Sequence, residues 1–415
     1  MTNRRDFLRS LATAGAGLLP GVHALGADSW AAVNSEPTGN HRLIVVLLRG
    51  AVDGLSVVVP YSERNYYAAR SSIAIPRPGQ DGGAIDLDGR FGLHPALASV
   101  QPLWQQGTLA FVHAAGSPDP TRSHFDAQDY VESGTPGRRA TADGWMNRLL
   151  GTLPGPSSPT RAVSVGPVMP RILAGRNSVA SIGSGPAAAR PTVLDRPMVG
   201  AAFSRLYDGD DRLSRAYREA QESRQEMMAS MADEMEIANG GAPLPNSLPG
   251  DASRLARLMR NDPRVQLAFI AVGGWDTHAN QGSSQGQLAN RLTPLGQGLA
   301  ALAQDLGPVF RDTVIVVMSE FGRTVRQNGN GGTDHGHGNV MWIVGGRVAG
   351  RKVHGAWPGL DDYRLYEGRD LAVATDYRTV LSSVLQQHLL TAESRLDAVF
   401  PARPERAAPL KLLHA

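Results

Sequence analysis

The sequence contains no cysteine among its 415 residues. This absence excludes disulfide bonds, thiolate metal ligands and a cysteine nucleophile. Any metal site in this chain must therefore use oxygen and nitrogen ligands, and an oxidising compartment would not affect the fold through thiol chemistry.

Long apolar runs are missing as well. Beyond residue 26 no stretch approaches the ~20 consecutive apolar residues needed to span a bilayer, so we expect no transmembrane segment in the mature chain. A strong excess of one charge is also lacking. The formal charge is +3, and removal of residues 1–26, with three arginines and one aspartate, lowers it by 2 to +1. So small a charge does not indicate a nucleic-acid partner, and we expect none.

The first 26 residues contain, in order, the features of a twin-arginine export signal. Arg4-Arg5 come first, Phe7-Leu8 and a mildly apolar stretch over 11–19 follow, and the small residues Ala24 and Gly26 come last. A short amphipathic helix is the alternative interpretation, but it does not explain this order. The sequence predicts recognition by the twin-arginine translocation machinery and a periplasmic or secreted protein.

Apolar runs that end in glycine or a polar cluster recur along the rest of the chain, at 41–56, 107–117, 161–166, 264–278, 312–323 and 339–346. Such runs are typical of strands buried on both faces of a sheet. Helical patterns occur between them, at 94–106, 123–133, 204–239, 287–306 and 376–390. This alternation predicts a mostly parallel sheet covered by helices on both sides. We expect its strands to include 42–48, 108–113, 265–271 and 313–318, side by side.

The domain organisation predicted from these patterns is simple. A linker over 27–40 leads to a single domain over 41–400, and 401–415 form a C-terminal tail. The Pro/Gly/Ser-rich stretches 151–160 and 240–250 are interpreted as surface connections, because strands on both sides of them are needed to complete one sheet. The methionine-rich segment 197–239 is expected to pack on the core as a helix or hairpin; a mobile lid is the weaker alternative.

Unusual polar residues gather where the predicted strands end, which is where ligands bind in open parallel sheets. Seven of them are candidate metal ligands: Asp53, Asp276, His278, Glu320, Asp334, His335 and His337. Such a set exceeds what one tetrahedral ion needs and suits two divalent ions, of Zn²⁺, Mn²⁺, Mg²⁺ or Ca²⁺, about 4 Å apart. In "WDTH" the spacing of two lets Asp276 and His278 point the same way and reach one ion.

Simpler explanations exist for several of these residues. Asp53 could cap the turn at Gly54, Ser123 could be an ordinary helix N-cap, and Glu320 could pair with Arg323. The loop "GNGGTDHGHGN" (329–339) is harder to explain in this way, because glycine is costly to order unless the backbone turns tightly or approaches another segment closely.

Several segments resemble one family of exported bacterial proteins, the domain of unknown function 1501. They include "LRGAVDGLSVVVPY", "GSPDPTRSHFDAQDYVESGTP", "GGWDTHANQ" and "SEFGRTVRQNGNGGTDHGHGNVMWIVGG". The resemblance covers nearly the whole mature chain. That family is similar in fold to the alkaline phosphatase and sulfatase superfamily. This more remote resemblance implies an α/β/α sandwich, a two-metal site, a Ser, Thr or formylglycine nucleophile at a helix N-terminus, and phosphate or sulfate ester chemistry.

Carried over to this chain, the resemblance makes Asp53 the first-strand metal aspartate and Ser123 the nucleophile. Two departures stand out. Glu320-Phe321 take the place of an Asp-His pair, which appears more than ten residues later as Asp334-His335. Pro118 occupies the position at which a sulfatase would carry the residue converted to formylglycine.

Two functions are therefore expected from the sequence. The first is a metal-dependent hydrolase of phosphate or sulfate esters, in which Ser123 attacks and Arg122 or Arg323 neutralises the anion. The second is a non-catalytic metal- or glycan-binding envelope protein on a phosphatase-like scaffold, since fold does not imply function. The expected substrate is an anionic ester or a glycan.

Overall fold

Strand β1 (Arg42–Leu48) lies in the middle of the fold, and all seven of its residues are buried. Its odd- and even-numbered side chains belong to two different hydrophobic clusters, one on each face of the sheet. A strand between two helical layers is apolar on both faces, which explains the unbroken run "RLIVVLL". The computed structural model describes residues 40–139, 141–156, 158–166, 168–185, 239–404 and 409–414.

The central sheet has the strand order β11-β5-β10-β9-β1-β8-β6-β7, and β12 also pairs with β5. Its strands are β5 (Leu109–Gly116), β6 (Ala162–Val165), β7 (Ala180–Ile182), β8 (Leu267–Val272), β9 (Thr313–Ser319), β10 (Asn339–Gly345), β11 (Val353–His354) and β12 (Thr375–Asp376). Only the pairs that involve β10 are antiparallel. The predicted mostly parallel sheet is confirmed, with β1 directly between β8 and β9. Of the four strands predicted to lie side by side, β8, β1 and β9 do so, whereas β10 separates β5 from β9.

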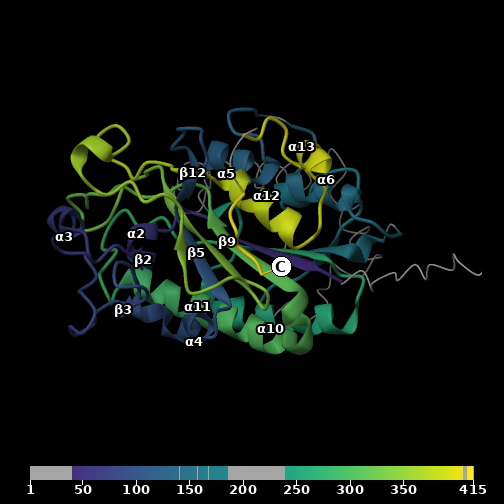
Figure 1. Ribbon diagram of the computed structural model, residues 1–415, viewed down its shortest axis with the longest axis horizontal. Helices are drawn as coiled ribbons and strands as arrows, with labels where there is room; N and C mark the ends of the chain where they lie inside the picture. The colour runs from purple at the N-terminus through teal and green to yellow at the C-terminus, as the bar shows by residue number, and fades with distance from the viewer. Residues whose placement is uncertain are drawn as a thin grey trace, which may run out of the picture. The chain divides into compact units, whose positions relative to one another are not determined.

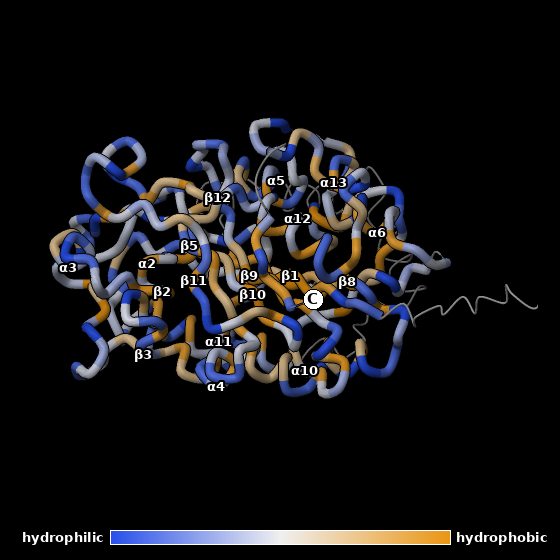
Figure 2. The backbone as a smooth tube through the Cα atoms, viewed as in Figure 1, coloured by the Kyte–Doolittle hydropathy of each residue, from blue (hydrophilic) through white to orange (hydrophobic). Residues whose placement is uncertain are grey.

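Helices cover both faces of this sheet (Figure 1). On one face lie the 3₁₀ segment η1 (Pro95–Val100), α4 (Gln101–Gln105), α10 (Leu248–Asn261) and α11 (Gln287–Leu306). On the other lie α5 (His124–Ser133), α6 (Trp145–Thr152), α12 (Tyr377–Gln387) and α13 (Glu393–Val399). Figure 2 shows apolar residues concentrated along the strands and the helix faces turned toward them. The α/β/α sandwich is thereby confirmed.

A small second sheet flanks the large one at one end. Its strands β2 (Val58–Val59), β4 (Gly92–Leu93) and β3 (Ile85–Asp86) lie beside the short helices α2 (Gly54–Val57) and α3 (Arg64–Ala69). From Asn40 onward the chain forms one compact unit. The predicted export signal, most of the linker and the helix predicted over 204–239, apart from residue 239, lie outside the described residues. No described helix is long and apolar enough to cross a membrane.

The direction of β10 decides which loops meet. Strands β1, β5, β8 and β9 run parallel, so their C-terminal ends share one edge of the sheet. Because β10 runs the other way, its first residue, Asn339, lies at that same edge, paired with Ala115 near the end of β5. The whole connection from β9 to β10, residues 320–338, therefore stays at the edge where the polar residues of the other strands emerge.

Candidate metal centre

The connection between β9 and β10 folds back on itself through backbone hydrogen bonds. The amide of Gly336 donates to the carbonyl of Gly322 at 2.8 Å, and the amide of Thr324 donates to the carbonyl of Asp334 at 2.9 Å. A Cβ atom on Gly336 would lie 2.4 Å from the carbonyl carbon of Arg323. Only glycine permits this close approach, which holds His335 beside the exit of β9.

A second glycine brings the same loop against the exit of β8. A Cβ atom on Gly332 would lie 2.4 Å from the backbone of His278. The side chain of Asn328 strengthens this contact by donating to the carbonyl of His278 at 2.8 Å and to the Asp334 carboxylate at 2.9 Å. The glycines of the loop thus allow it to pack closely on the strand ends.

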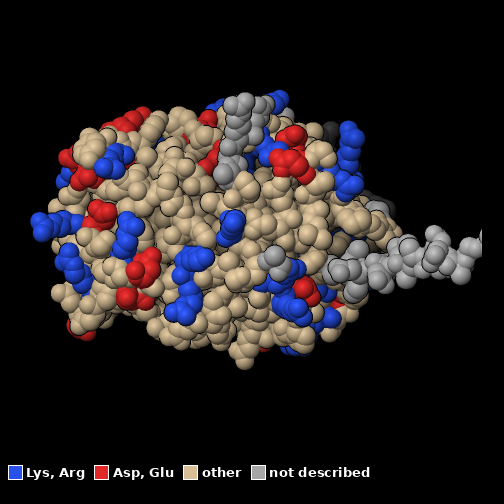
Figure 3. Space-filling model, viewed as in Figure 1, with Lys and Arg blue, Asp and Glu red and all other residues tan. Residues whose placement is uncertain are grey.

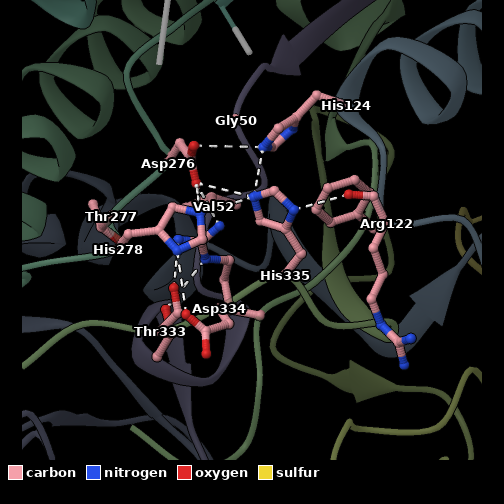
Figure 4. Close-up of polar contacts among 12 residues, drawn as sticks. Gly50, Val52, Arg122, His124, Asp276, Thr277, His278, Thr333, Asp334 and His335 are labelled. Carbon is pink, nitrogen blue, oxygen red and sulfur yellow. Dashed lines mark hydrogen bonds and ion pairs between the residues drawn. The ribbon is translucent and has the colours of Figure 1, made fainter. Parts of the chain in front are cut away.

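Three imidazoles and one carboxylate converge at this edge (Figure 4). His335 Nε2 lies 3.0 Å from His124 Nε2 and 2.9 Å from His278 Nε2. Asp276 lies among them: its Oδ1 is 3.0 Å from His278 Nε2 and 3.4 Å from His335 Nε2, and its Oδ2 is 3.6 Å from His124 Nε2. We call these four side chains the metal-centre residues.

The other nitrogen of each imidazole faces a hydrogen-bond acceptor. His335 Nδ1 lies 2.8 Å from the carbonyl of Arg122, and His124 Nδ1 lies 2.8 Å from Glu320 Oε1. His278 Nδ1 lies 3.3 Å from Asp334 Oδ1. Since these acceptors cannot donate, each Nδ1 carries the hydrogen, and in a neutral ring Nε2 keeps its lone pair. Metal-binding histidines in proteins are oriented in this way.

The separations between these donor atoms suit a small divalent ion. Tetrahedral ligands with metal–nitrogen bonds of about 2.0–2.1 Å are spaced about 3.3 Å apart. The separations given above run from 2.9 to 3.6 Å. Among the residues that the structure describes, His124, Asp276 and His335 form the group whose donor atoms all lie within 4.8 Å of one another. These three residues therefore fit one cation. His278 lies outside this group, but its Nε2 is 2.9 Å from His335 Nε2 and 3.0 Å from Asp276 Oδ1, which makes it the neighbouring candidate for a fourth donor.

The carboxylate of Asp276 is buried and strongly held in its charged form. Burial raises its pKa, but hydrogen bonds with the three imidazoles and the charge of Arg323 outweigh burial and hold the pKa well below its usual range. Arg323 donates to Asp276 Oδ1 at 2.6 Å and to the carbonyl of Thr333 at 2.6 Å. Its buried guanidinium thus positions Asp276. Arg323 was predicted from the sequence to neutralise the anionic substrate, and the structure places it in this supporting position.

The pKa of the His124 imidazole is raised by its carboxylate neighbours. Burial lowers its pKa, but hydrogen bonds to Asp276 and Glu320 outweigh burial and raise the pKa to about 9. Glu320 is itself buried and accepts from the amide of Gly50 at 2.8 Å and from Gln128 at 2.9 Å. A cation that enters the centre must displace the proton of His124, since a metal ligand must be deprotonated.

A family model described as "Protein of unknown function (DUF1501)" matches residues 40–399. The chain belongs to this family. Among curated proteins no match to this DUF1501 chain is found.

Solved structures similar to the DUF1501 chain have low sequence identity to it. Ps i-CgsB in complex with k-i-k-neocarrahexaose is 10% identical, with a TM-score of 0.40 over 86% of this chain and 74% of that one. BT1596, a 2-O GAG sulfatase, is 10% identical, with a TM-score of 0.38 over 89% and 76%. A protein in the alkaline phosphatase superfamily from Vibrio parahaemolyticus is 10% identical, with a TM-score of 0.35 over 76% and 62%.

Five of the seven predicted ligands lie in or around the centre of this DUF1501 protein. Asp276, His278 and His335 present donor atoms to it. Glu320 and Asp334 lie behind His124 and His278 and orient their rings. Glu320 does not pair with Arg323, which was the simpler explanation for it, because Arg323 contacts Asp276 instead.

The structure does not bring Asp53 and His337 to the centre. The buried carboxylate of Asp53 accepts from Arg70 at 2.5 and 3.0 Å, from Ser56 at 2.8 Å and from Gln281 at 2.7 Å. Burial raises the pKa of Asp53, but the charge of Arg70 outweighs burial and keeps the pKa low. The buried ring of His337 stacks on Tyr366 with centroids 4.5 Å apart. The carboxylate of Asp53 is thus satisfied by hydrogen bonds within the protein, and the ring of His337 packs on Tyr366.

The two remaining predicted residues lie at the start of α5. Ser123 is exposed and caps the helix, with its Oγ accepting from the amide of Asp126 at 3.4 Å. The guanidinium of Arg122 points away from the centre in Figure 4 and binds Glu367 at 2.6 Å and Asp370 at 2.7 Å. Only the carbonyl of Arg122 reaches the centre, at His335. Neither side chain is placed among the metal-centre residues.

His124 was not among the candidate ligands predicted from the sequence. Its position in the sequence could have identified it, because His124 directly follows Ser123 at the start of the helix that comes after the apolar run "LAFVHA". Within this first turn Ser123 faces solvent and His124 faces the sheet edge, with a 7% exposed side chain.

Proposed function

We propose that this protein binds one divalent cation of the Zn²⁺ class through His124, His278, His335 and Asp276 and hydrolyses phosphate or sulfate esters outside the cytoplasm. One observation supports the proposal above the others: three Nε2 atoms and a buried carboxylate face one another while every Nδ1 is held by an acceptor. Two ions were expected from the sequence. We propose one, because Asp53 and His337 are engaged elsewhere.

A bound divalent cation polarises an ester oxygen and stabilises the negative charge that develops on it. The protein itself leaves the centre accessible to an ester and orients the anionic group of that ester. The side chains of His278 and Asp334 are 35% and 55% exposed, so an ester can approach from their side. The N-terminus of α5, next to His124, favours an anionic group through the positive end of the helix dipole. Ser123, directly before His124, is the hydroxyl available at this position as nucleophile.

Replacing Ser123 tests its role as the nucleophile. We expect Ser123→Ala to lower the rate of phosphate or sulfate ester hydrolysis at least about 10³-fold, because the attacking oxygen is gone. Metal content should stay at the wild-type level, since Ser123 is not a ligand. Measurement of turnover on 4-nitrophenyl phosphate and sulfate, with metal analysis of the same samples, checks both statements.

Ser123→Gly is the matched control for the loss of the helix cap. Glycine at an N-cap costs only a few tenths of a kcal/mol, whereas alanine costs about 1 kcal/mol. Both variants lack the hydroxyl, so both should be inactive while differing in stability. Retention of wild-type turnover by either variant would exclude Ser123 as the nucleophile.

A non-catalytic metal- or glycan-binding protein is the second candidate. It is favoured by the placement of the Arg122 guanidinium with Glu367 and Asp370 and by the use of Ser123 Oγ as a cap. Protein that holds stoichiometric metal but hydrolyses no member of a phosphate and sulfate ester panel would support this candidate and exclude the hydrolase.

We infer that residues 1–26 direct export through the twin-arginine pathway. Its receptor recognises the arginine pair rather than positive charge in general, so Arg4→Lys with Arg5→Lys should leave the protein in the cytoplasm. Arg9→Lys, outside the pair, is the control and should be exported normally. Fractionation of cells followed by immunoblotting measures the outcome. Normal periplasmic yield of the double variant would show that the signal is of another type.

A further inference from the structure

A cavity of about 300 Å³ lies between α3, the β9–β10 connection at Val325 and Arg326, and the segment 360–369 that contains the 3₁₀ turn η8 (Asp362–Arg364). Helix α3 and the segment 360–369 are at the same end of the molecule in Figure 1. Its volume is at the lower end of the range of small-ligand pockets. Its apolar lining includes Ala69, Val325 and Leu360. Its polar lining consists of Asn65, Arg326, Arg369 and one carboxylate, that of Asp362.

The cavity and the metal centre share structural parts. Arg369, which lines the cavity, donates to the backbone carbonyl of His335, one of the metal-centre residues. Its Nε also donates to Asp370 at 2.9 Å. Val325 lies two positions beyond Arg323, the residue that holds Asp276. A molecule in the cavity therefore lies against the same loop that presents the metal ligands.

The guanidinium of Arg326 is available to a ligand. Its side chain is 70% exposed, and the nearest carboxylate, Asp362, lies 4.0 Å away and is itself 85% exposed. An ion pair this long and this exposed contributes little. A guanidinium offers a planar fork of donors that matches the oxygens of a sulfate, phosphate or carboxylate group.

The walls of the cavity are fixed before any ligand enters. The amide of Val325 donates to the carbonyl of Arg369 at 3.2 Å, and the amide of Tyr366 donates to the carbonyl of Asp370 at 2.8 Å. From below, the buried Arg70 donates to the carbonyl of Val325 at 2.9 Å. A preformed site loses less entropy on binding than a site that must be ordered by its ligand.

We propose that this cavity is a subsite for a second anionic group of the substrate, recognised by Arg326 with Arg369 beside an apolar lining that accepts an apolar or sugar-ring face. The assignment of the occupant as a substrate rests on the proposed hydrolase function. The substrate class is then an ester that carries a further sulfate, phosphate or carboxylate beside the group at the metal centre. Figure 3 shows charges of both signs interspersed on the visible face, so recognition is local rather than the work of a broad basic surface.

Direct binding measurements test the subsite without requiring turnover. Calorimetric titrations with glucose 6-sulfate, glucose 6-phosphate, glucuronate and uncharged glucose distinguish the possible anions and the sugar ring. We expect at least one of the three anionic probes to bind and Arg326→Ala to weaken it at least about tenfold, because a charge-assisted hydrogen bond is lost. Glucose should bind much more weakly than that probe. Arg257→Ala, an exposed arginine on α10, is the control and should bind as wild type.

The titrations are repeated on protein stripped of cations by a chelator, which separates the subsite from the metal centre. Anion binding that persists there and is lost in Arg326→Ala supports the subsite even if no ester is hydrolysed, in which case only the proposed hydrolase function fails. Equal binding by wild type and Arg326→Ala, no anion binding at all, or equal weakening by Arg326→Ala and Arg257→Ala would overturn the subsite.

Discussion

His335→Ala is expected to abolish stoichiometric binding of divalent cations. His335 Nε2 is the donor atom closest to the other two imidazoles, 2.9 and 3.0 Å from them, so its loss removes the central ligand of the four. Even residues that only orient a ligand cost 10–100-fold in affinity when mutated, and for a ligand itself we expect a loss of at least about 10³-fold. Chelator competition with Zn²⁺ and elemental analysis of the purified variant measure this loss.

His337→Ala is the matched control for this experiment. His337 belongs to the same loop, two positions away, and is buried against Tyr366 rather than turned to the centre. It should lose packing and some stability but keep the cation. If both variants bind Zn²⁺ like the wild type, the four residues do not form a metal centre, and the proposed hydrolase loses its main support.

Arg70→Ala is expected to destabilise the protein by about 3–5 kcal/mol, because it leaves the buried carboxylate of Asp53 without its cationic partner. Both side chains are nearly inaccessible, with 0% and 1% exposure. Ser56 and Gln281 would remain as hydrogen-bond donors, but neither carries a charge. Urea unfolding of the variant and the wild type measures the difference.

Asp53→Asn and the double variant Asp53→Asn/Arg70→Met complete this test. If Asp53 serves the fold, the double variant should recover part of the stability lost in Arg70→Ala, since no buried charge is left unpaired. Metal content should be unchanged in Asp53→Asn. Loss of the cation in Asp53→Asn would instead restore the first-strand aspartate to the ligand set that the sequence analysis predicted.

The convergence of Asp276, His278, Asp334 and His335 was predictable from the sequence. It follows from the direction of the strands and from the position of these polar residues next to the strand ends. Apolar runs identify strands buried on both faces, and parallel strands deliver their C-terminal loops to one edge. The same reasoning does not give the direction of β10, since a run such as "NVMWIVGG" reads alike in either direction. In the structure β10 pairs antiparallel with both β9 and β5.

The sequence could not show which of two adjacent polar residues faces the centre, or which distant residue pairs with a buried carboxylate. At the start of α5, Ser123 and His124 are both polar, and only the docking of the helix turns one outward and the other toward Asp276. The partner of Asp53 is Arg70, 17 positions away. The residues around Asp53 in the sequence do not distinguish an aspartate paired with arginine from an aspartate that binds a metal. Such assignments depend on tertiary contacts, which also place the Arg122 guanidinium beside Glu367 and Asp370.

The origin of the metal-centre residues in distant parts of the chain has a consequence for the order of folding. His124 and His335 are separated by 211 positions, and His278 and His335 by 57. Contacts of such high contact order form late, because long loops must close before they are made. A cation bound at this centre would therefore have no assembled site in the unfolded chain. It would stabilise the native state by mass action. Interactions that are absent from the folding transition state act mainly by slowing unfolding, so occupancy of the centre would lengthen the lifetime of a protein already folded.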